Sequence, residues 1–225
     1  MKTLTEAAII ESWQKNVQPW ITAIHNAEIA TRIQVTNQAI IDAITKPSPK
    51  AVLDVGCGEG WLVRELIPKG IDALGIDVIP EFIESASKQK VGRFKVLPYE
   101  ETSHHQLKEK FDVVVCNFSL LGETSVNILF QQIPALLNDK GVFIVQTIHP
   151  IMACGNNKYE DGWREGSWAG FNENFTSPAP WYFRTIKSWK ALFDANGFKL
   201  SKINEPINPI TNEPASILFF GELDS

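Results

Sequence analysis

The segment Ala51–Gly60 constrains the fold of this chain more than any other stretch. It begins with a short apolar run, Val52–Val55, which is typical of a buried parallel strand. Three glycines follow at alternate positions: Gly56, Gly58 and Gly60. The next residues, 61–67, have helical character. A strand, a glycine-rich loop and a helix in this order predict a corner that binds an anion or a nucleotide, because glycine lets the backbone turn tightly and approach a ligand closely.

The spacing of the glycines indicates which nucleotide to expect. A dinucleotide-binding fingerprint, G-x-G-x-x-G, that began at Gly56 would need glycine at position 61, where the chain has Trp61. The chain instead places Asp54 two positions ahead of three alternating glycines. A second acidic residue, Asp77, ends the next predicted strand, 21 positions after Gly56. That position suits an acceptor for the hydroxyl groups of a ribose.

This pattern resembles the first motif of the class I S-adenosylmethionine-dependent methyltransferases, and Asp77 resembles their second-strand acidic residue. The resemblance covers about residues 51–222 and is most specific over residues 52–77. It implies an α/β fold, a three-layer αβα sandwich around a mostly parallel seven-stranded sheet in the order 3-2-1-4-5-7-6. It also implies N-terminal helices over the site and S-adenosyl-L-methionine as cofactor. An aromatic-rich insertion is expected after the fifth strand.

The resemblance and the ends of the predicted strands together give a set of expected cofactor contacts. They are Asp54, Gly56, Cys57, Gly58, Gly60, Asp77, Val78, Tyr99, Glu100, Asn117 and Phe118. In the family, an aspartate after the third strand often holds the adenine edge, and this chain has Tyr99 and Glu100 there instead, for which a plain loop is the alternative. Asn117 and Phe118 end the fourth strand, and ligands of open α/β sheets bind beyond the carboxyl ends of the strands.

The chain is expected to form a single methyltransferase domain, residues 1–225, in four parts. Residues 1–46 are a helical cap, 51–150 the cofactor-binding half, 151–186 an aromatic lid insertion, and 187–225 a closing helix with an antiparallel strand pair. Pro19 is expected to divide the helical cap, and Thr124 to cap a later helix. The resemblance lets Trp13, Trp20 and Arg32 touch the site, although the tryptophans could simply pack the helices onto the sheet.

The predicted insertion is unusually aromatic. It holds eight of the chain's aromatic residues in 36 positions, and a disordered segment would be poor in them. We interpret it as a lid or a substrate wall, with a structural flap or a dimer contact as alternatives. The expected substrate-contacting residues are Leu120, Trp163, Trp168 and Trp181.

Methyl transfer needs a nucleophile aligned opposite the departing sulfur, and a base only if the acceptor holds a proton. His149 follows the fifth strand and has a suitable unperturbed pKa, so it is a candidate catalytic residue together with Tyr182. The alternative for His149 is a hydrogen-bonded end to its strand. No metal-ligand spacing occurs, so no metal site is expected.

Composition favours a small acceptor. The formal net charge is −5 and lysine and arginine form no cluster, which weighs against a nucleic-acid substrate. Residues Met1–Glu6 lack the apolar core of a signal peptide, no run is long enough to span a membrane, and the three cysteines suggest no disulfide framework. We therefore expect a cytoplasmic monomer or homodimer that methylates a small molecule. A nucleic-acid or protein methyltransferase, or a non-catalytic nucleotide-binding protein, are the alternatives.

Overall fold

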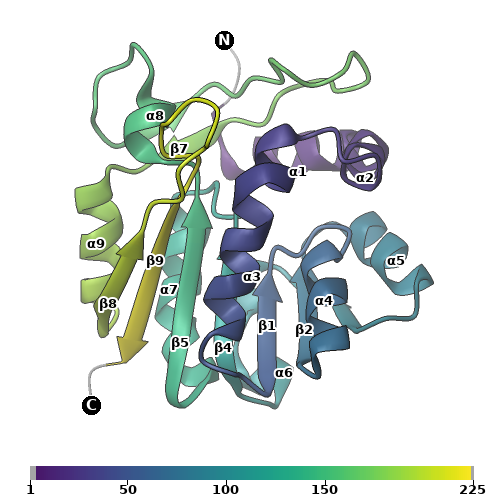
Figure 1. Ribbon diagram of the computed structural model, residues 1–225, viewed down its shortest axis with the longest axis vertical. Coiled ribbons are helices and arrows are strands. Elements are labelled where there is room, and N and C mark those ends of the chain that lie inside the picture. Colours follow the sequence, from purple (N-terminus) through teal and green to yellow (C-terminus); the bar gives the residue numbers. More distant parts are fainter. Residues whose placement is uncertain (1–3, 224–225) are drawn as a thin grey trace.

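The computed structural model describes residues 4–223 and has a twisted seven-stranded sheet at its centre (Figure 1). Its strands are β1 (Ala51–Val55), β2 (Asp72–Asp77), β3 (Arg93–Val96), β4 (Phe111–Asn117), β5 (Leu137–Thr147), β8 (Phe198–Asn204) and β9 (Ile217–Leu223). They are arranged in the order β3-β2-β1-β4-β5-β9-β8. The pairs from β3 to β5 are parallel, and β9 is antiparallel to both of its neighbours. This confirms the predicted order, since β8 and β9 are the sixth and seventh strands of this sheet.

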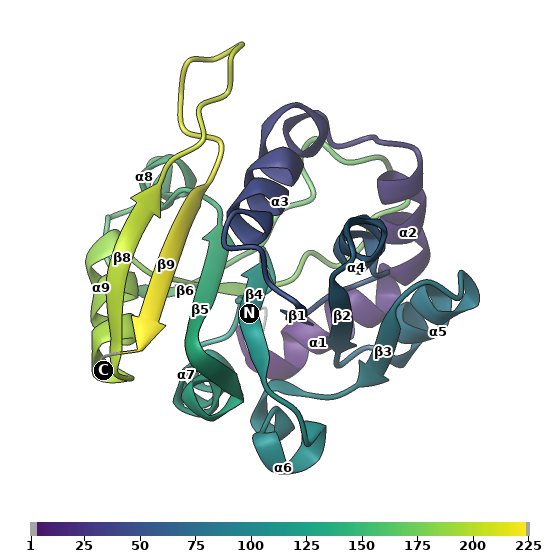
Figure 2. The ribbon, with the colours of Figure 1, turned by 60° about the horizontal axis from the view of Figure 1, so that its bottom comes forward.

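Helices cover both faces of the sheet (Figures 1 and 2). The helices are α1 (Glu6–Lys15), α2 (Val17–His25), α3 (Asn37–Thr45), α4 (Trp61–Leu66), α5 (Pro80–Lys88), α6 (His104–Leu107), α7 (Thr124–Leu136), α8 (Pro150–Cys154) and α9 (Ile186–Ala195). Single turns of 3₁₀-helix occupy Ile67–Lys69 and Tyr99–Glu101. Apolar side chains of α3 and α4 pack on one face of the sheet, and those of α7 and α9 pack on the other. The central strands are buried on both faces, as their continuous apolar sequences require.

The N-terminal cap departs from the sequence prediction in where its helices break. The first break falls at Asn16, whose side chain is fully buried, and not at Pro19. Pro19 lies in the first turn of α2, where its missing N–H has no intrahelical partner to lose. Before α3 the chain forms one turn of π-helix, η1 (Arg32–Thr36), a rare wide turn that often occurs at functional sites.

Helix α7 begins in a different way from the predicted cap at Thr124. Thr124 is its first residue, and the cap is supplied from α1 by the carboxylate of Glu6. Glu6 Oε1 accepts hydrogen bonds from the backbone N–H groups of residues 123, 124 and 125 at 2.9, 2.6 and 3.1 Å. A carboxylate at this end also complements the helix dipole. This contact ties α1 to the layer beneath it across more than 100 residues of sequence.

The insertion lies at the carboxyl ends of the parallel strands, together with α1, α2 and α8 (Figure 1). It contains a separate antiparallel hairpin of β6 (Gly162–Arg164) and β7 (Trp181–Phe183). Within residues 4–223, no helix combines the length and the apolar character needed to cross a membrane. Met1–Thr3, half of the segment inspected for a signal peptide, lie outside the described residues, as do residues 224–225 of the predicted domain.

Candidate active site

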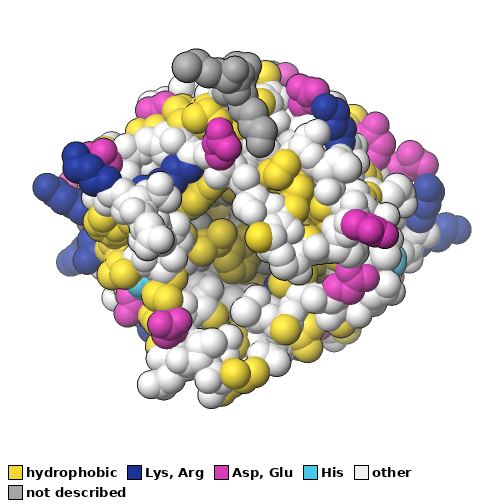
Figure 3. Space-filling model, turned by 90° about the horizontal axis from the view of Figure 1, so that it is seen from above, with side chains coloured by type: hydrophobic (Ala, Val, Ile, Leu, Met, Phe, Trp, Pro, Cys, Tyr) yellow, Lys and Arg dark blue, Asp and Glu magenta, His cyan; other side chains and the backbone are white. Residues whose placement is uncertain are grey.

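A cavity of about 600 Å³ opens above the carboxyl ends of the parallel strands. Seen from above, the molecule is hollowed near its centre, and hydrophobic side chains form the floor of the hollow (Figure 3). The glycine-rich loop and the ends of β2 and β4 line one part of this cavity, and α1, α2, η1 and the insertion line the rest. This is the place where open α/β sheets bind ligands.

The three glycines of the loop have different surroundings, although all have positive φ, at 76°, 55° and 83°. A Cβ on Gly56 or Gly60 would lie 2.3 or 2.6 Å from a neighbouring side chain, so these two allow close packing. A Cβ on Gly58 would meet only Trp20 Nε1, at 3.7 Å, and Gly58 lines the cavity. The backbone at Gly58 is therefore the part of the loop that a ligand can approach. Gly60 was predicted to contact the cofactor, but it does not line the cavity.

Asp77 lies at the end of β2 with 8% of its surface exposed, and it lines the cavity. Its Oδ2 accepts a hydrogen bond from Gly58 N, and its Oδ1 accepts one from Ile79 N, both at 2.9 Å. Burial raises the pKa of Asp77, while these N–H donors oppose the shift. Each carboxylate oxygen retains capacity for a further donor. Asp77 therefore both fixes the glycine loop and offers acceptors for hydroxyl groups.

Asp54 lies at the end of β1 and is 2% exposed, without lining the cavity. Burial, reinforced by the charges of Asp77 and Glu59, raises the pKa of Asp54 to about 8, against the opposing effect of Arg32. Its carboxyl group is thus mostly protonated at neutral pH. The sequence predicted a direct cofactor contact for Asp54, whereas the structure places it behind the loop.

Two polar groups that line the cavity have atoms without a hydrogen-bond partner. Asn117 Oδ1 and Arg32 Nη2 are both buried and both unpaired within the described part of the chain. The Arg32 guanidinium lies 5.6 Å from the ring centroid of Trp20 and 4.8 Å from that of Trp61. Burial lowers the pKa of Arg32 to about 10, so the side chain stays cationic at neutral pH. An unpaired cation and an unpaired acceptor match the carboxylate and the positively charged groups of S-adenosylmethionine.

The remaining predicted cofactor contacts also lie on the cavity wall: Cys57, Val78, Tyr99, Glu100 and Phe118. Tyr99 Oη donates a hydrogen bond to Ser119 O at 2.8 Å, directly beside the glycine loop. Phe118 has a φ of 56°, a left-handed conformation that costs a non-glycine residue about 1–3 kcal/mol and occurs often at active sites. The end of β4 therefore has the strained backbone that is common where a fold positions a ligand.

Aromatic side chains form most of the cavity away from the glycine loop. Trp168, Trp181 and Leu120 line it, as predicted, together with Trp13 and Phe171. Trp163 does not line it: its Nε1 donates a hydrogen bond to Glu123 Oε2 at 3.2 Å, and its ring packs on Tyr182. Trp163 therefore supports the cavity wall through Tyr182, the residue opposite it in the hairpin.

The structure does not bring His149 into the cavity. Its neighbours Ile148 and Pro150 line the cavity, but His149 is 3% exposed and does not. His149 Nε2 lies 3.0 Å from Glu205 Oε1, and Nδ1 has no partner in the described chain. The ring thus faces the β8–β9 connection, where Glu205 lies. This geometry matches the alternative interpretation, a hydrogen-bonded strand end.

Tyr182, the other candidate catalytic residue, does line the cavity. Burial and a hydrogen bond with Glu123 raise the pKa of Tyr182, so the phenol is neutral. Arg184 lies 4.8 Å from the Tyr182 ring and donates hydrogen bonds to Gly122 O and Glu123 O at 2.8 and 3.0 Å. Neither Glu123 nor Arg184 was predicted from the sequence. Their only sequence signal was charge next to predicted site residues.

Comparisons with known proteins identify relatives of this chain. A family profile described as a methyltransferase domain matches residues 29–203. A ubiquinone biosynthesis O-methyltransferase from Haemophilus ducreyi is 33% identical over 108 residues, which are 44% of this chain and 46% of that protein. An uncharacterized methyltransferase from Schizosaccharomyces pombe is 25% identical over 189 residues, which are 76% of this chain and 67% of that protein. The match to the Haemophilus protein thus spans about half of its length.

Solved structures share the fold. An S-adenosylmethionine-dependent methyltransferase from Clostridium acetobutylicum superposes with a TM-score of 0.68 at 15% identity, covering 92% of this chain and 99% of that one. A 1,6-didemethyltoxoflavin-N1-methyltransferase from Burkholderia thailandensis, solved with its substrate and S-adenosylhomocysteine, gives a TM-score of 0.63 at 17% identity, over 94% and 88% of the two chains.

The fold and the glycine-loop site define a class I, Rossmann-like α/β domain with a cofactor cavity above its sheet. The chain belongs to the methyltransferase-domain family, and solved structures that share its fold are S-adenosylmethionine-dependent methyltransferases. The residues of this chain fit that cofactor, since Gly58 leaves room for it, Asp77 offers acceptors, and Arg32 and Asn117 hold unpaired polar atoms. Residues 4–223 contain no group of three potential metal-ligating side chains.

Proposed function

We propose that this protein transfers a methyl group from S-adenosylmethionine to the oxygen of a small, flat, largely apolar acceptor. The observation that carries the proposal is the aromatic half of the cavity, which lines the same open hollow as the glycine loop. Its volume of about 600 Å³ is within the range of small-molecule sites, about 300–1,000 Å³. The net charge of −5 and the lack of a basic cluster favour such an acceptor over a nucleic acid.

We assign the cofactor's contacts along the cavity wall. The Gly58 backbone and Asp77 serve the ribose, and Val78, Tyr99 and Glu100 serve the adenine. Arg32 and Asn117 serve the methionine end, where their unpaired atoms lie, with Cys57 and Phe118 completing that part of the wall. The bound cofactor supplies an electrophilic methyl group. Everything else the chain contributes is binding, alignment and exclusion of water.

Tyr182 and Glu123 are the groups we assign to the acceptor's proton. The neutral Tyr182 hydroxyl lies on the cavity wall and is hydrogen bonded to Glu123. It can accept the proton of an acceptor hydroxyl while its own proton passes to the Glu123 carboxylate. Transfer would form the carbon–oxygen bond, break the methyl–sulfur bond of the cofactor, and leave S-adenosylhomocysteine with one proton on Glu123. The relatives named as O-methyltransferases support oxygen as the acceptor atom.

Two measurements test the proposal. Calorimetry should detect binding of S-adenosylhomocysteine and no binding of NAD. Transfer of a radioactive methyl group from S-adenosylmethionine should then be measured with a panel of small phenols, and with total tRNA and unfolded protein as the competing acceptor classes. Labelling of phenols alone supports the proposal, and preferential labelling of RNA or protein contradicts it.

A pair of variants tests the proton route. Tyr182→Phe and Glu123→Gln should lower kcat about 10²-fold or more, the usual contribution of a general base, with S-adenosylhomocysteine affinity unchanged. Tyr159→Phe is a matched control, because Tyr159 is a tyrosine of the same insertion that does not line the cavity. An unchanged kcat in Tyr182→Phe, with an active acceptor, would remove the tyrosine from the reaction.

A further inference from the structure

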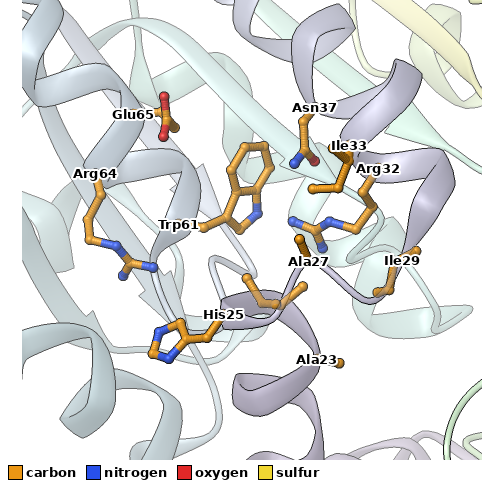
Figure 4. Close-up of a pocket in the computed structure, with 11 residues that line it drawn as sticks. Ala23, His25, Ala27, Ile29, Arg32, Ile33, Asn37, Trp61, Arg64 and Glu65 are labelled. Atoms are coloured by element: carbon orange, nitrogen blue, oxygen red, sulfur yellow. The ribbon is translucent and has the colours of Figure 1, made fainter.

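A second, smaller cavity of about 220 Å³ lies behind the glycine-loop helix (Figure 4). It is enclosed by the end of α2, the 26–31 connection, η1, the start of α3 and the outer face of α4. Arg32, Trp61 and Ile29 line both this side cavity and the cofactor cavity. The side cavity is therefore distinct from the cofactor site but shares a wall with it.

Basic side chains outnumber acidic ones in the lining of the side cavity. Arg32, Arg64 and His25 line it, and Glu65 is the single carboxylate among its lining residues in the described chain. Arg64 is held by the buried carboxylate of Glu59, whereas the Arg32 side chain makes no hydrogen bond within residues 4–223 and has a buried, unpaired Nη2. In Figure 4 the Arg32 guanidinium lies beside the Trp61 indole, with the Glu65 carboxylate on the other side of that ring.

The rest of the lining suits a compact apolar body and one polar group. Ala23, Ile24, Ala27, Ile29 and Ile33 supply apolar surface. The Asn37 side chain lies on the cavity and forms no hydrogen bond within residues 4–223, so it is available as a donor. A ligand with a carboxylate next to Arg32 and Asn37, and an apolar body on the isoleucines, would satisfy both sets of contacts.

We propose that the side cavity binds a small monocarboxylate, and that its occupation weakens binding of the cofactor. The reason for the coupling is the shared guanidinium. A carboxylate in the side cavity and the carboxylate of the cofactor would face the same positive charge of Arg32 from two sides, and two anions so placed repel each other. By thermodynamic linkage, the cofactor must weaken binding of the small carboxylate by the same factor. This inference goes beyond the proposed methyl transfer and requires only that the cofactor binds.

Calorimetry with benzoate as the probe tests the inference. S-adenosylhomocysteine should bind several-fold more weakly as benzoate is added, and the loss should reach a plateau, because the two ligands occupy separate sites. Equal ionic strength supplied as sodium chloride should leave the affinity unchanged. Titration of S-adenosylhomocysteine without benzoate reports on the cofactor site alone, so failure of the side cavity and failure of the cofactor site are distinguishable.

A matched pair of variants locates the effect. Asn37→Asp adds a negative charge on the side cavity, so it should weaken benzoate binding at least several-fold. Benzoate should then no longer weaken the binding of S-adenosylhomocysteine. Gln34→Glu adds the same charge on an exposed position of η1 that lines neither cavity, and it should behave as the wild type. If benzoate weakens S-adenosylhomocysteine binding without reaching a plateau, or weakens it equally in Asn37→Asp, then benzoate competes directly in the cofactor site. Either result would overturn the inference. Absence of benzoate binding would overturn it as well.

Discussion

Gly58 and Gly70 have the same left-handed backbone but different surroundings. Substituting each of them distinguishes the effect of backbone strain from the effect of losing contact with a ligand. Their φ values are 55° and 80°, and a Cβ on Gly70 would meet no atom within 4 Å. Gly58→Val and Gly70→Val should each lose about 1–2 kcal/mol of unfolding free energy, the cost of that conformation for a side chain. Only Gly58→Val should also lose S-adenosylhomocysteine binding, by more than tenfold in calorimetry. Equal affinity in the two variants would reduce the loop to a turn.

The raised pKa of Asp54 makes the stability of the protein depend on pH. The folded state keeps this carboxyl protonated up to about pH 8, whereas an unfolded aspartate loses its proton near 3.8. Between these values the folded state binds the extra proton, so stability falls as pH rises, by at most about 1.4 kcal/mol per unit. Above about pH 8, this carboxyl group causes no further loss of stability.

Asp54→Asn should remove this dependence, because the amide is neutral in both states. Urea unfolding of the wild type and the variant at pH 5 to 9 gives the difference between them, in which the other titrating groups cancel. The variant should gain stability relative to the wild type as pH rises and stop gaining above about pH 8. A difference that does not vary with pH would contradict the buried, protonated carboxyl.

At the scale of single residues, the sequence predicted the site residues that local backbone geometry positions. It did not predict those whose side chains are positioned by contacts with distant parts of the chain. Gly58 and Asp77 were predicted from loop geometry and strand ends, and both line the cavity. Glu123 was not predicted, because the role we propose for it depends on its hydrogen bond with Tyr182 of β7. His149 was placed near the rim by topology, but its side-chain direction depends on Glu205, 56 residues away.

At the scale of elements, α1 and α7 depend on one carboxylate. Glu6→Ala should cost about 0.5–2 kcal/mol of unfolding free energy, because three N–H groups at the start of α7 lose their acceptor. Glu11→Ala is the matched control on the same helix. Glu11 is exposed and, among residues 4–223, pairs only with Lys15, so its loss should change stability much less. Equal effects of the two changes would mean that water replaces the cap.

The strands and most helices followed from periodicity, since continuous apolar runs such as Phe111–Asn117 have few alternatives to a buried strand. The breaks in the N-terminal cap did not. Pro19 is compatible with a first helical turn, so the sequence could not show that the break precedes it. Asn16 ends α1 instead, because its side chain is used by a segment 160 residues away. The π-helix η1 likewise has no local sequence signal.

At the scale of the whole molecule, the insertion and the N-terminal helices form one roof. Asn16 Nδ2 donates a hydrogen bond to Thr176 O at 2.7 Å, and Asn16 Oδ1 accepts one from Thr176 N at 2.9 Å. Trp168 packs on Trp13 with ring centroids 5.6 Å apart. Trp168 is thus a support of the roof as well as part of the cavity wall. A lid that opens at the insertion must carry α1 and α2 with it or break these contacts.

Asn16→Ala tests whether the roof opens as one unit. Asn196→Ala is the matched control: both asparagines end a helix and donate to a carbonyl four residues earlier, but Asn196 has no partner in the insertion. Asn16→Ala removes both hydrogen bonds to Thr176, worth about 0.5–1.5 kcal/mol each, although Thr176 O keeps the bond from Trp168 Nε1, so roof opening should become about tenfold more frequent. Trypsin should then cut at the exposed Lys158 correspondingly faster in Asn16→Ala than in Asn196→Ala.

S-adenosylhomocysteine should slow this cleavage in the wild type if the roof closes on the bound cofactor. Trp181→Ala tests a cavity residue that does not join the insertion to the N-terminal helices. Trp181 lines the cavity and packs on Phe183 of the same hairpin, without a described contact to α1 or α2. The substitution should leave both the cleavage rate and the cofactor affinity within a few-fold of the wild type, and lower only turnover of the acceptor. Trp168→Ala should instead speed cleavage, since it removes the contact with Trp13. If Trp168→Ala and Trp181→Ala behave alike in proteolysis, the insertion does not move with the N-terminal helices, and the roof is two independent parts.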